Sequence, residues 1–235
     1  LCPTRELCIQ ITNDLLSYSK YLKKINILSV YGGVKIEKQI NSLKKGPQIV
    51  VGTPGRTNDL IRRKKLIIGN IDRLILDEAD EMLSMGFKED LEAIIQQTPK
   101  QKQILLFSAT MTPKVVGVTK KYMKDSLEIA VARVNRAADN VEHIFYVVKP
   151  RDRYEVVKRI ADMNPDIYGI VFCRTRRETK DIAIKLMNDH YNADTIHGDL
   201  SQSERDDVMR RFRKGQLQIL VATDVAARGL DVEDL

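Results

Sequence analysis

The sequence predicts an α/β protein with two parallel β-sheets, each flanked by helices. Two observations support this prediction: short apolar runs typical of buried strands alternate with segments of helical periodicity, and the alternation occurs twice along the chain. A polar segment without clear periodicity, residues 133–140, separates the two series. We therefore expect a first domain at residues 1–132, a linker at 133–140 and a second domain at 141–235.

The first series predicts five strands, at residues 25–31, 49–52, 74–76, 103–107 and 128–131. Helices are expected between them. In one of these, residues 6–17, the side chains of Leu7, Ile11 and Leu15 share one face, and residues 88–97 show the same periodicity. The short run at 74–76 is entirely apolar, so that strand is expected to be covered on both faces.

The second series predicts four strands, at residues 141–148, 169–172, 193–196 and 218–222, and three helices, at 153–162, 177–188 and 203–214. Ser201 followed by Glu204 predicts a capping box at the start of the last helix. Repeated strand–helix units favour parallel sheets with helices on both faces in each domain.

The composition is that of an ordinary globular protein. The 235 residues suffice for two domains with cores of their own, and the chain is 43% hydrophobic and 30% charged. It has no run of about 18 apolar residues that could span a membrane. Its three cysteines are too few and too scattered for a disulfide framework or a structural zinc site. We expect a cytoplasmic protein.

The positive charge is concentrated in the first half of the chain. Of a net charge of +7, residues 1–132 supply all the excess, with 21 Lys and Arg against 14 Asp and Glu, whereas residues 133–235 carry 18 of each. A solvated surface accounts for most of these side chains. A polyanionic partner is the alternative, and the charge alone leaves it open.

An acidic cluster, Asp77-Glu78-Ala79-Asp80, directly follows the predicted strand at 74–76. The carboxyl ends of parallel strands are where α/β sheets bind ligands. Asp77 could hold Mg²⁺ through its waters, and Glu78 could orient or deprotonate an attacking water. Carboxylates also stabilise a helix N-terminus. Taken alone, the cluster fits both interpretations.

Seven further motifs accompany this cluster. Three precede the cluster in the chain: Pro3-Thr4-Arg5-Glu6-Leu7, Gly32-Gly33 and Thr53-Pro54-Gly55-Arg56. Four follow it: Ser108-Ala109-Thr110, Val171-Phe172-Cys173-Arg174-Thr175, His197-Gly198-Asp199 and the segment from Ala222 to Asp231. In order and approximate spacing, the eight motifs resemble those of the DEAD-box RNA helicases, and the resemblance covers essentially the whole chain.

The resemblance implies two RecA-like domains that together bind ATP and a single RNA strand, and an enzyme that couples ATP hydrolysis to RNA unwinding. ATP and Mg²⁺ are the implied cofactors. The implied catalytic residues are Asp77, Glu78, Asp80, Ser108 and Thr110, with Mg²⁺ held by Asp77 through water. The hydroxyl groups of Ser108 and Thr110 are expected to bond Asp80.

The resemblance also assigns the ligand contacts. Gly229 and Asp231 are assigned to the nucleotide. The RNA contacts are assigned to Thr4, Arg5, Gly32, Gly33, Thr53, Gly55, Arg56, Arg174, Thr175, Gln202 and Thr223. Contacts to phosphates carry no sequence information, so RNA binding is expected to be independent of sequence. A lone histidine, His197, argues against a metal site at its motif.

The sequence also departs from the family pattern. We find neither the adenine-reading glutamine motif nor a Gly-x-x-x-x-Gly-Lys-Thr phosphate loop, and the final arginine-rich motif is missing. We therefore expect an internal fragment of a longer helicase that alone hydrolyses ATP negligibly. The alternatives are a non-catalytic RNA-binding clamp and, more weakly supported, a metal-dependent phosphohydrolase or nuclease.

Overall fold

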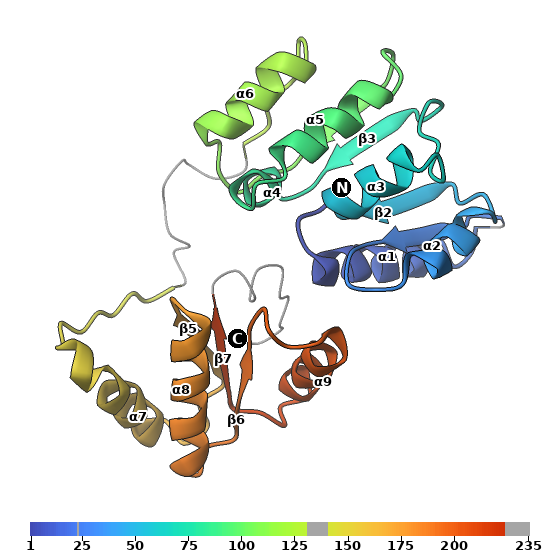
Figure 1. Ribbon diagram of the computed structural model, residues 1–235. Coiled ribbons are helices and arrows are strands. Elements are labelled where there is room, and N and C mark those ends of the chain that lie inside the picture. Colours follow the sequence, from blue (N-terminus) through green and yellow to red (C-terminus); the bar gives the residue numbers. More distant parts are fainter. Residues whose placement is uncertain (23, 131–140, 224–235) are drawn as a thin grey trace. The chain divides into compact units, whose positions relative to one another are not determined.

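The computed structural model describes residues 1–22, 24–130 and 141–223. The chain forms two compact units, unit 1 (Leu1–Leu127) and unit 2 (Glu128–Leu235) (Figure 1). The domain boundaries expected from the sequence stay predictions, since the expected linker at 133–140 lies outside the described residues. In the described part of the chain, no helix is both long and apolar enough to cross a membrane.

Unit 1 alternates helices and strands as the periodicity predicts. Its elements are α1 (Arg5–Tyr18), β1 (Ile27–Val30), α2 (Ile36–Leu43), β2 (Ile49–Gly52), α3 (Pro54–Arg62), β3 (Arg73–Leu76), α4 (Ala79–Ser84), α5 (Lys88–Gln97), β4 (Gln103–Leu106) and α6 (Pro113–Tyr122). The strands form two parallel pairs, β1 with β2 and β3 with β4. In each pair the first residues of the two strands lie opposite each other, Ile27 opposite Ile49 and Arg73 opposite Gln103.

The first two residues of the chain connect these strand pairs. The backbone N–H of Cys2 donates to the carbonyl of Gly52 at 3.1 Å, and the N–H of Asp77 donates to the carbonyl of Leu1 at 2.8 Å. The amino group of Leu1 also donates to the carbonyl of Ile75 at 2.6 Å. Residues 1–2 therefore lie between β2 and β3 and hold the carboxyl ends of both strands at one edge.

Helices cover both faces of the β1–β2 pair. On one face, Cys8 and Ile11 of α1 pack with Val51. On the other face, Leu60 and Ile61 of α3 pack with Val30. This is the two-sided burial that repeated βα units predict.

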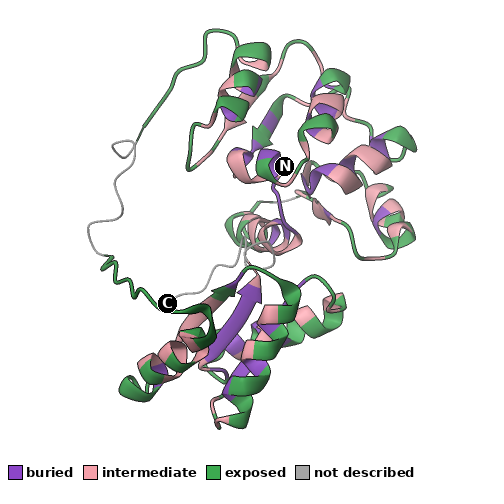
Figure 2. Cartoon of the chain, turned by 60° about the vertical axis from the view of Figure 1, so that its left-hand side comes forward, coloured by how far each residue is buried: buried purple, intermediate pink, exposed green. Residues whose placement is uncertain are grey.

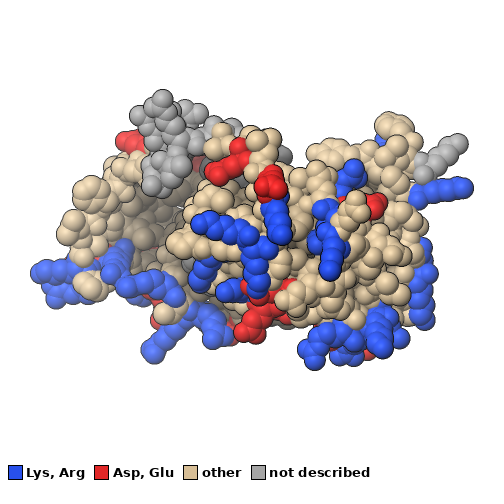
Figure 3. Space-filling view, turned by 90° about the horizontal axis from the view of Figure 1, so that it is seen from above, with Lys and Arg blue, Asp and Glu red and all other residues tan. Residues whose placement is uncertain are grey.

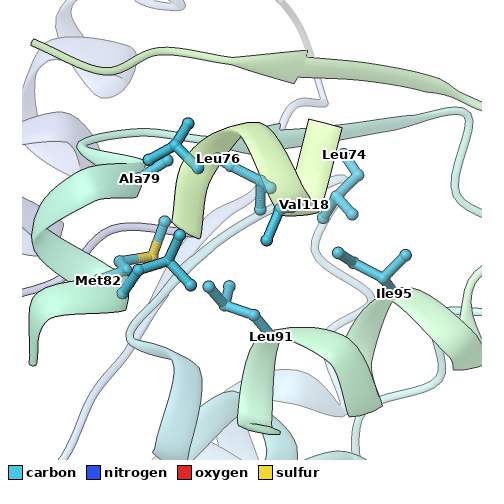
Figure 4. Close-up of a cluster of buried hydrophobic side chains, with 9 residues drawn as sticks. Leu74, Leu76, Ala79, Met82, Leu91, Ile95 and Val118 are labelled. Atoms are coloured by element: carbon cyan, nitrogen blue, oxygen red, sulfur yellow. The ribbon is translucent and has the colours of Figure 1, made fainter. Parts of the chain in front are cut away.

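The β3–β4 pair is covered differently from the expectation. Leu74 and Leu76 lie in a core with α4, α5 and α6 (Figure 4). Ile75 points to the opposite face and is 44% exposed, as Phe107 is at 55%. The prediction of a strand buried on both faces is therefore wrong for residues 74–76 in the described structure. An all-apolar run of three residues does not report how many layers pack on a strand.

Unit 2 contains a three-stranded parallel sheet in the order β5-β7-β6. Its elements are η1 (Pro150–Asp152), α7 (Arg153–Met163), β5 (Gly169–Cys173), α8 (Arg176–Asn188), β6 (Ala193–Ile196), α9 (Gln202–Arg213) and β7 (Ile219–Thr223). The middle strand, β7, is almost wholly buried, as its purple colour in Figure 2 shows. Leu186 of α8 packs with Val221 on one face, and Phe212 of α9 packs with Leu220 on the other. The capping box of Ser201 and Glu204 at the start of α9 is confirmed.

Two expected strands are wrong. Residues 128–130 and 141–148 form no strand, and residue 131 lies outside the described residues. The apolar side chains of the second segment are exposed, with Phe145 at 85% and Val147 at 92%. A sequence pattern typical of a strand gives a strand only where a neighbouring strand supplies its hydrogen bonds, because an unpaired strand is not stable in water. The three described strands of unit 2 pair with one another and not with this segment.

Gly52, the last residue of β2, is required by packing. A Cβ atom there would lie 2.2 Å from Thr57 Oγ1 and 2.8 Å from Val30 Cγ2. Gly69 in the same unit has open space where its Cβ would be. We expect Gly52→Ala to destabilise unit 1 by about 2 kcal/mol through overpacking, and Gly69→Ala to change stability by less than about 0.5 kcal/mol. Urea unfolding followed by circular dichroism checks this, and equal stability of the two variants would contradict it.

Candidate functional site

The acidic cluster lies at the carboxyl end of β3, as the sequence predicts. Asp77 follows the strand, and Glu78 has left-handed backbone angles, with φ at 49°. This conformation is uncommon for a residue with a side chain and is found preferentially at functional sites. The N–H of Ala79 donates to the carbonyl of Phe107 at 3.0 Å, which links the cluster to the end of β4. Helix α4 begins at Ala79, so Asp80 also lies in the first turn of a helix, and both interpretations of the cluster hold.

The expected contact between Asp80 and the Ser108-Ala109-Thr110 turn is confirmed. Asp80 Oδ2 accepts hydrogen bonds from the Thr110 hydroxyl at 2.6 Å and from the Thr110 N–H at 2.9 Å. The Ser108 hydroxyl accepts from the N–H of Asp80 at 3.3 Å and donates to the carbonyl of Thr110 at 2.8 Å. Three of these hydrogen bonds therefore fix the turn after β4 to the first turn of α4, and the fourth, between Ser108 and Thr110, closes the turn itself.

The pKa values of two carboxylates of this cluster, Asp80 and Glu78, are shifted in opposite directions. Burial acts to raise the pKa of Asp80, but the hydrogen bonds from Thr110 and Ser108 outweigh it, so the pKa lies below the ordinary value. Burial raises the pKa of Glu78, and the negative charges of Asp77 and Glu81 add to the effect. A carboxylate with a raised pKa is a better proton acceptor near neutral pH. The geometry thus separates a fixed anion, Asp80, from a candidate base, Glu78.

The residues of unit 1 that are expected to contact RNA gather at the carboxyl ends of β1 and β2. Thr4 caps α1, with its hydroxyl accepting from the N–H of Leu7 at 3.2 Å. The guanidinium of Arg5 lies over the ring of Tyr31, 4.8 Å from its centroid. Thr53 is the N-cap of α3 and makes no capping bond through its side chain, and Pro54 occupies the first helical position. Three separate motifs therefore meet at one edge.

Gly32 and Gly33 follow β1 and are exposed. Gly33 has a φ of 79°, which favours glycine, whereas a Cβ at Gly32 would meet open space. Arg56 does not simply extend into solvent. Its Nη1 donates to Gln39 Oε1 at 3.0 Å and its Nη2 donates to the carbonyl of Val34 at 3.1 Å. Gln39 was not identified from the sequence, because a glutamine within an amphipathic helix carries no signal of burial.

In unit 2, Arg174 and Thr175 lie between β5 and α8. Thr175 caps α8 by accepting from the N–H of Glu178 at 3.1 Å, and the Glu178 carboxylate accepts from the N–H of Arg174 at 3.2 Å. Gln202 begins α9 and donates to Asp206 at 2.9 Å. Thr223 ends β7, opposite Cys173 in the register of the sheet. The structure therefore places the four predicted RNA contacts of unit 2 at the carboxyl ends of strands or the starts of helices.

Basic residues that the sequence analysis did not assign lie beside Thr175. Arg176 forms an ion pair with Asp199, and Lys180 Nζ lies 3.5 Å from the other oxygen of this carboxylate. With Arg177 and Asp181 they line a shallow hollow at the start of α8. In the sequence, the run Arg174-Thr175-Arg176-Arg177 could have indicated the two added arginines.

Basic side chains are also numerous elsewhere on the surface. Figure 3 shows Lys and Arg side chains spread over the drawn face, with fewer acidic ones.

His197 is buried at the end of β6, and its Nδ1 accepts a hydrogen bond from the N–H of Asp199 at 3.2 Å. Burial, followed by the positive charge of Lys180, lowers its pKa, which favours the neutral ring. Among the described residues, no three His, Cys, Asp or Glu side chains group together as metal ligands. Gly229 and Asp231, predicted to contact the nucleotide, lie outside the described residues.

Comparison with known families decides the classification. Residues 1–118 match the DEAD/DEAH box helicase family, and residues 152–235 match the helicase conserved C-terminal domain. The chain belongs to the DEAD/DEAH box helicase family. Its curated relatives include the ATP-dependent RNA helicase CshA of Listeria monocytogenes, 44% identical over 99% of this chain, and the DEAD-box helicase CshA of Streptococcus pneumoniae, 45% identical over 99% of it. The chain spans 44% of the length of each.

Solved structures of DEAD-box proteins share the fold. A DEAD box protein from Methanococcus jannaschii is 46% identical, with a TM-score of 0.53, and the match covers 99% of this chain and 62% of that one. Dbp5 of S. cerevisiae, solved bound to RNA and ADP BeF3, is 31% identical with a TM-score of 0.85, covering 99% and 59%. The two units are thus RecA-like domains of a DEAD-box helicase.

The lowered pKa of Asp80 gives a pH-dependent prediction. Since the folded-state pKa lies below the unfolded value of about 3.9, the Asp80–Thr110 contact stabilises unit 1 above that pH and ceases to do so as the pH falls through the folded pKa. Thr110→Val should therefore destabilise unit 1 at about pH 6, and the difference from wild type should narrow towards about pH 3. Urea unfolding at both pH values measures it.

The matched control is Thr119→Val, because the Thr119 hydroxyl donates to the carbonyl of Val116 at 2.9 Å rather than to a carboxylate. Its effect should not depend on pH. A Thr110→Val deficit that is equally large at both pH values would contradict the role of the Asp80 carboxylate.

Proposed function

We propose that this chain is part of an ATP-dependent RNA helicase that couples ATP binding and hydrolysis to local unwinding of RNA duplexes. The observation that supports this best is the hydrogen bonding of Asp80 to Thr110 and Ser108 beside Asp77 and Glu78. It joins a candidate phosphate-reacting edge to a turn that leads into α6. Through this link, hydrolysis of a nucleotide bound beside Asp77 and Glu78 would alter the position of the turn and of α6.

The residues present fit the magnesium ion and the nucleotide phosphates that the family implies. Asp77 offers carboxylate oxygens at the end of β3, and Mg²⁺ prefers one or two carboxylates together with waters and phosphates over a complete protein cage. Asp77 would hold the ion through its waters, and bound Mg²⁺ would neutralise charge on the phosphates. Glu78, with its raised pKa, would orient or deprotonate the attacking water. Asp80, Ser108 and Thr110 would couple this step to RNA.

RNA would bind along the carboxyl edges of the sheets. Backbone N–H groups at the starts of α1, α3 and α8, together with basic side chains, are suited to phosphates and carry no preference for base sequence. The proposed contacts are Thr4, Arg5, Gly32, Gly33, Thr53, Gly55, Arg56, Arg174, Thr175, Gln202 and Thr223. Gly229 and Asp231 are proposed to contact ATP. The domain limits at 1–132 and 141–235 and a cytoplasmic location also remain proposals from the sequence.

The alternatives receive less support from the structure. A metal-dependent nuclease needs several ligands on one ion, and the described residues supply no such group of three. A non-catalytic RNA clamp would use the same RNA contacts but has no need for the strained backbone of Glu78 or the elevated pKa of its side chain. We therefore retain the helicase as the proposal.

The test is phosphate release from ATP by the product of the complete gene, measured with and without single-stranded RNA. We expect RNA to stimulate turnover, and Glu78→Gln to lower the stimulated rate by about 100-fold or more, since a general base contributes about that factor. Glu89→Gln is the matched control, because Glu89 is an exposed carboxylate on α5, away from the end of β3.

Each alternative gives a different result in this experiment. RNA binding without RNA-stimulated phosphate release would support the clamp. RNA shortened in the presence of Mg²⁺ without ATP would support the nuclease. An unchanged rate in Glu78→Gln would contradict the role assigned to that carboxylate.

A further inference from the structure

Gln39 is a polar side chain in an apolar setting. It lies in the middle of α2, is 6% exposed, and shares that helix with Ile36 and Ile40, which pack against the core. Burying an amide is costly unless its hydrogen bonds are made. A buried glutamine is therefore informative about what it contacts.

Both ends of the Gln39 amide are used. Its Nε2 donates to the carbonyl of Tyr31 at 3.0 Å, and its Oε1 accepts from Arg56 Nη1 at 3.0 Å. The second arm of the Arg56 guanidinium, Nη2, donates to the carbonyl of Val34 at 3.1 Å. The Gln39–Arg56 pair thus binds the carbonyl at each end of the four-residue segment Tyr31-Gly32-Gly33-Val34.

This segment needs such support. Two consecutive glycines have more conformational freedom than any other pair of residues and lose more entropy when they are fixed. Both are exposed, and Gly33 is in the left-handed region, with φ at 79°. The Arg5 guanidinium over the Tyr31 ring adds a third contact, from the start of α1. The turn is therefore held at its ends and left open in its middle.

We propose that Gln39 is a positioning residue that fixes the Gly32–Gly33 turn in a conformation suited to one phosphate of a single-stranded RNA. The proposal rests on the proposed function, because it takes RNA to bind at this edge. Fixing the turn before binding removes an entropic cost from binding. Arg56 supports the turn through two of its nitrogens, which donate to Gln39 and Val34, and its guanidinium has further N–H groups for the phosphate contact proposed above.

The amide is the group that this position requires. Glutamine donates and accepts at once, whereas glutamate would keep the acceptor for Arg56 and place a negative oxygen against the Tyr31 carbonyl. Leucine would remove both bonds and leave the Arg56 and Tyr31 groups without this partner. Gln39→Glu therefore loses the bond to Tyr31 and keeps the bond to Arg56, whereas Gln39→Leu loses both.

The chain offers a matched control. Gln48 makes two bonds of the same kind elsewhere in unit 1: its Oε1 accepts from the N–H of Asn26 at 2.7 Å, and its Nε2 donates to the carbonyl of Gly46 at 2.8 Å. These bonds lie at the start of β1 and β2, the opposite end of the strands from Gly32 and Gly33. Gln48 is exposed, unlike Gln39, and Gln48→Leu should remove a glutamine bridge of unit 1 without touching the turn.

The first measurement is hydrogen exchange of the RNA-free protein, read by mass spectrometry in peptides that contain residues 31–34. We expect faster exchange there in Gln39→Leu and Gln39→Glu and unchanged exchange in Gln48→Leu. Unchanged exchange in both Gln39 variants would overturn the proposal that this side chain fixes the turn.

The second measurement is binding of a fluorescein-labelled oligouridine by fluorescence anisotropy. We expect Gln39→Leu to raise the Kd about tenfold, the effect of one lost buried hydrogen-bond bridge, and Gln48→Leu to leave it within about twofold. Gln39→Glu should weaken binding as Gln39→Leu does, because both detach the turn. Equal affinities of the Gln39 variants and wild type, or an equal loss in Gln48→Leu, would refute the proposal.

The two measurements separate this inference from the proposed function. If the wild-type protein does not bind oligouridine, the RNA site itself is refuted, and with it the phosphate role of the turn. Exchange at residues 31–34 would still support or refute the fixing of the turn by Gln39.

Discussion

The structure of unit 1 depends on the parallel alignment of its strands, which brings every strand's carboxyl end to one edge. The hydrogen bonds of Leu1 and Cys2 maintain this alignment between the two strand pairs, because they connect Gly52 at the end of β2 with Ile75 and Asp77 at the end of β3. The acidic cluster follows one strand pair and most of the candidate RNA contacts follow the other, and residues 1–2 bridge the two pairs. One edge of unit 1 therefore presents both the acidic cluster and the proposed RNA contacts, where parallel α/β sheets bind ligands.

Two hydrogen-bonded networks order this edge. One fixes the turn after β4 to the acidic cluster through Asp80 and Thr110. The other fixes the glycine turn after β1 to the start of α3 through Gln39 and Arg56. Both use a buried or half-buried polar side chain to hold an exposed turn. Preorganised turns of this kind are what phosphate binding and phosphoryl transfer require.

The sequence predicts much of this arrangement, because alternating periodicity and motif order are local signals. The contact of Asp80 with Thr110 was implied by the resemblance to DEAD-box helicases, and the capping box of Ser201 and Glu204 followed from spacing alone. The strand at 141–148 was wrong because pairing depends on a neighbour that periodicity does not report. Gln39 and Gly52 were missed for the same reason: their roles arise from contacts with residues far away in the sequence or across the sheet.

We propose that RNA runs over the carboxyl edge of unit 1 and is held there through contacts to its backbone. Crosslinking with a photoreactive oligouridine, followed by mass spectrometry of the attached peptides, tests it most directly. The account predicts attachment at residues 4–5, 32–33 and 53–56, competed equally well by oligomers of any base sequence. Attachment concentrated at the opposite edge, at residues 45–48 and 99–102, would contradict it.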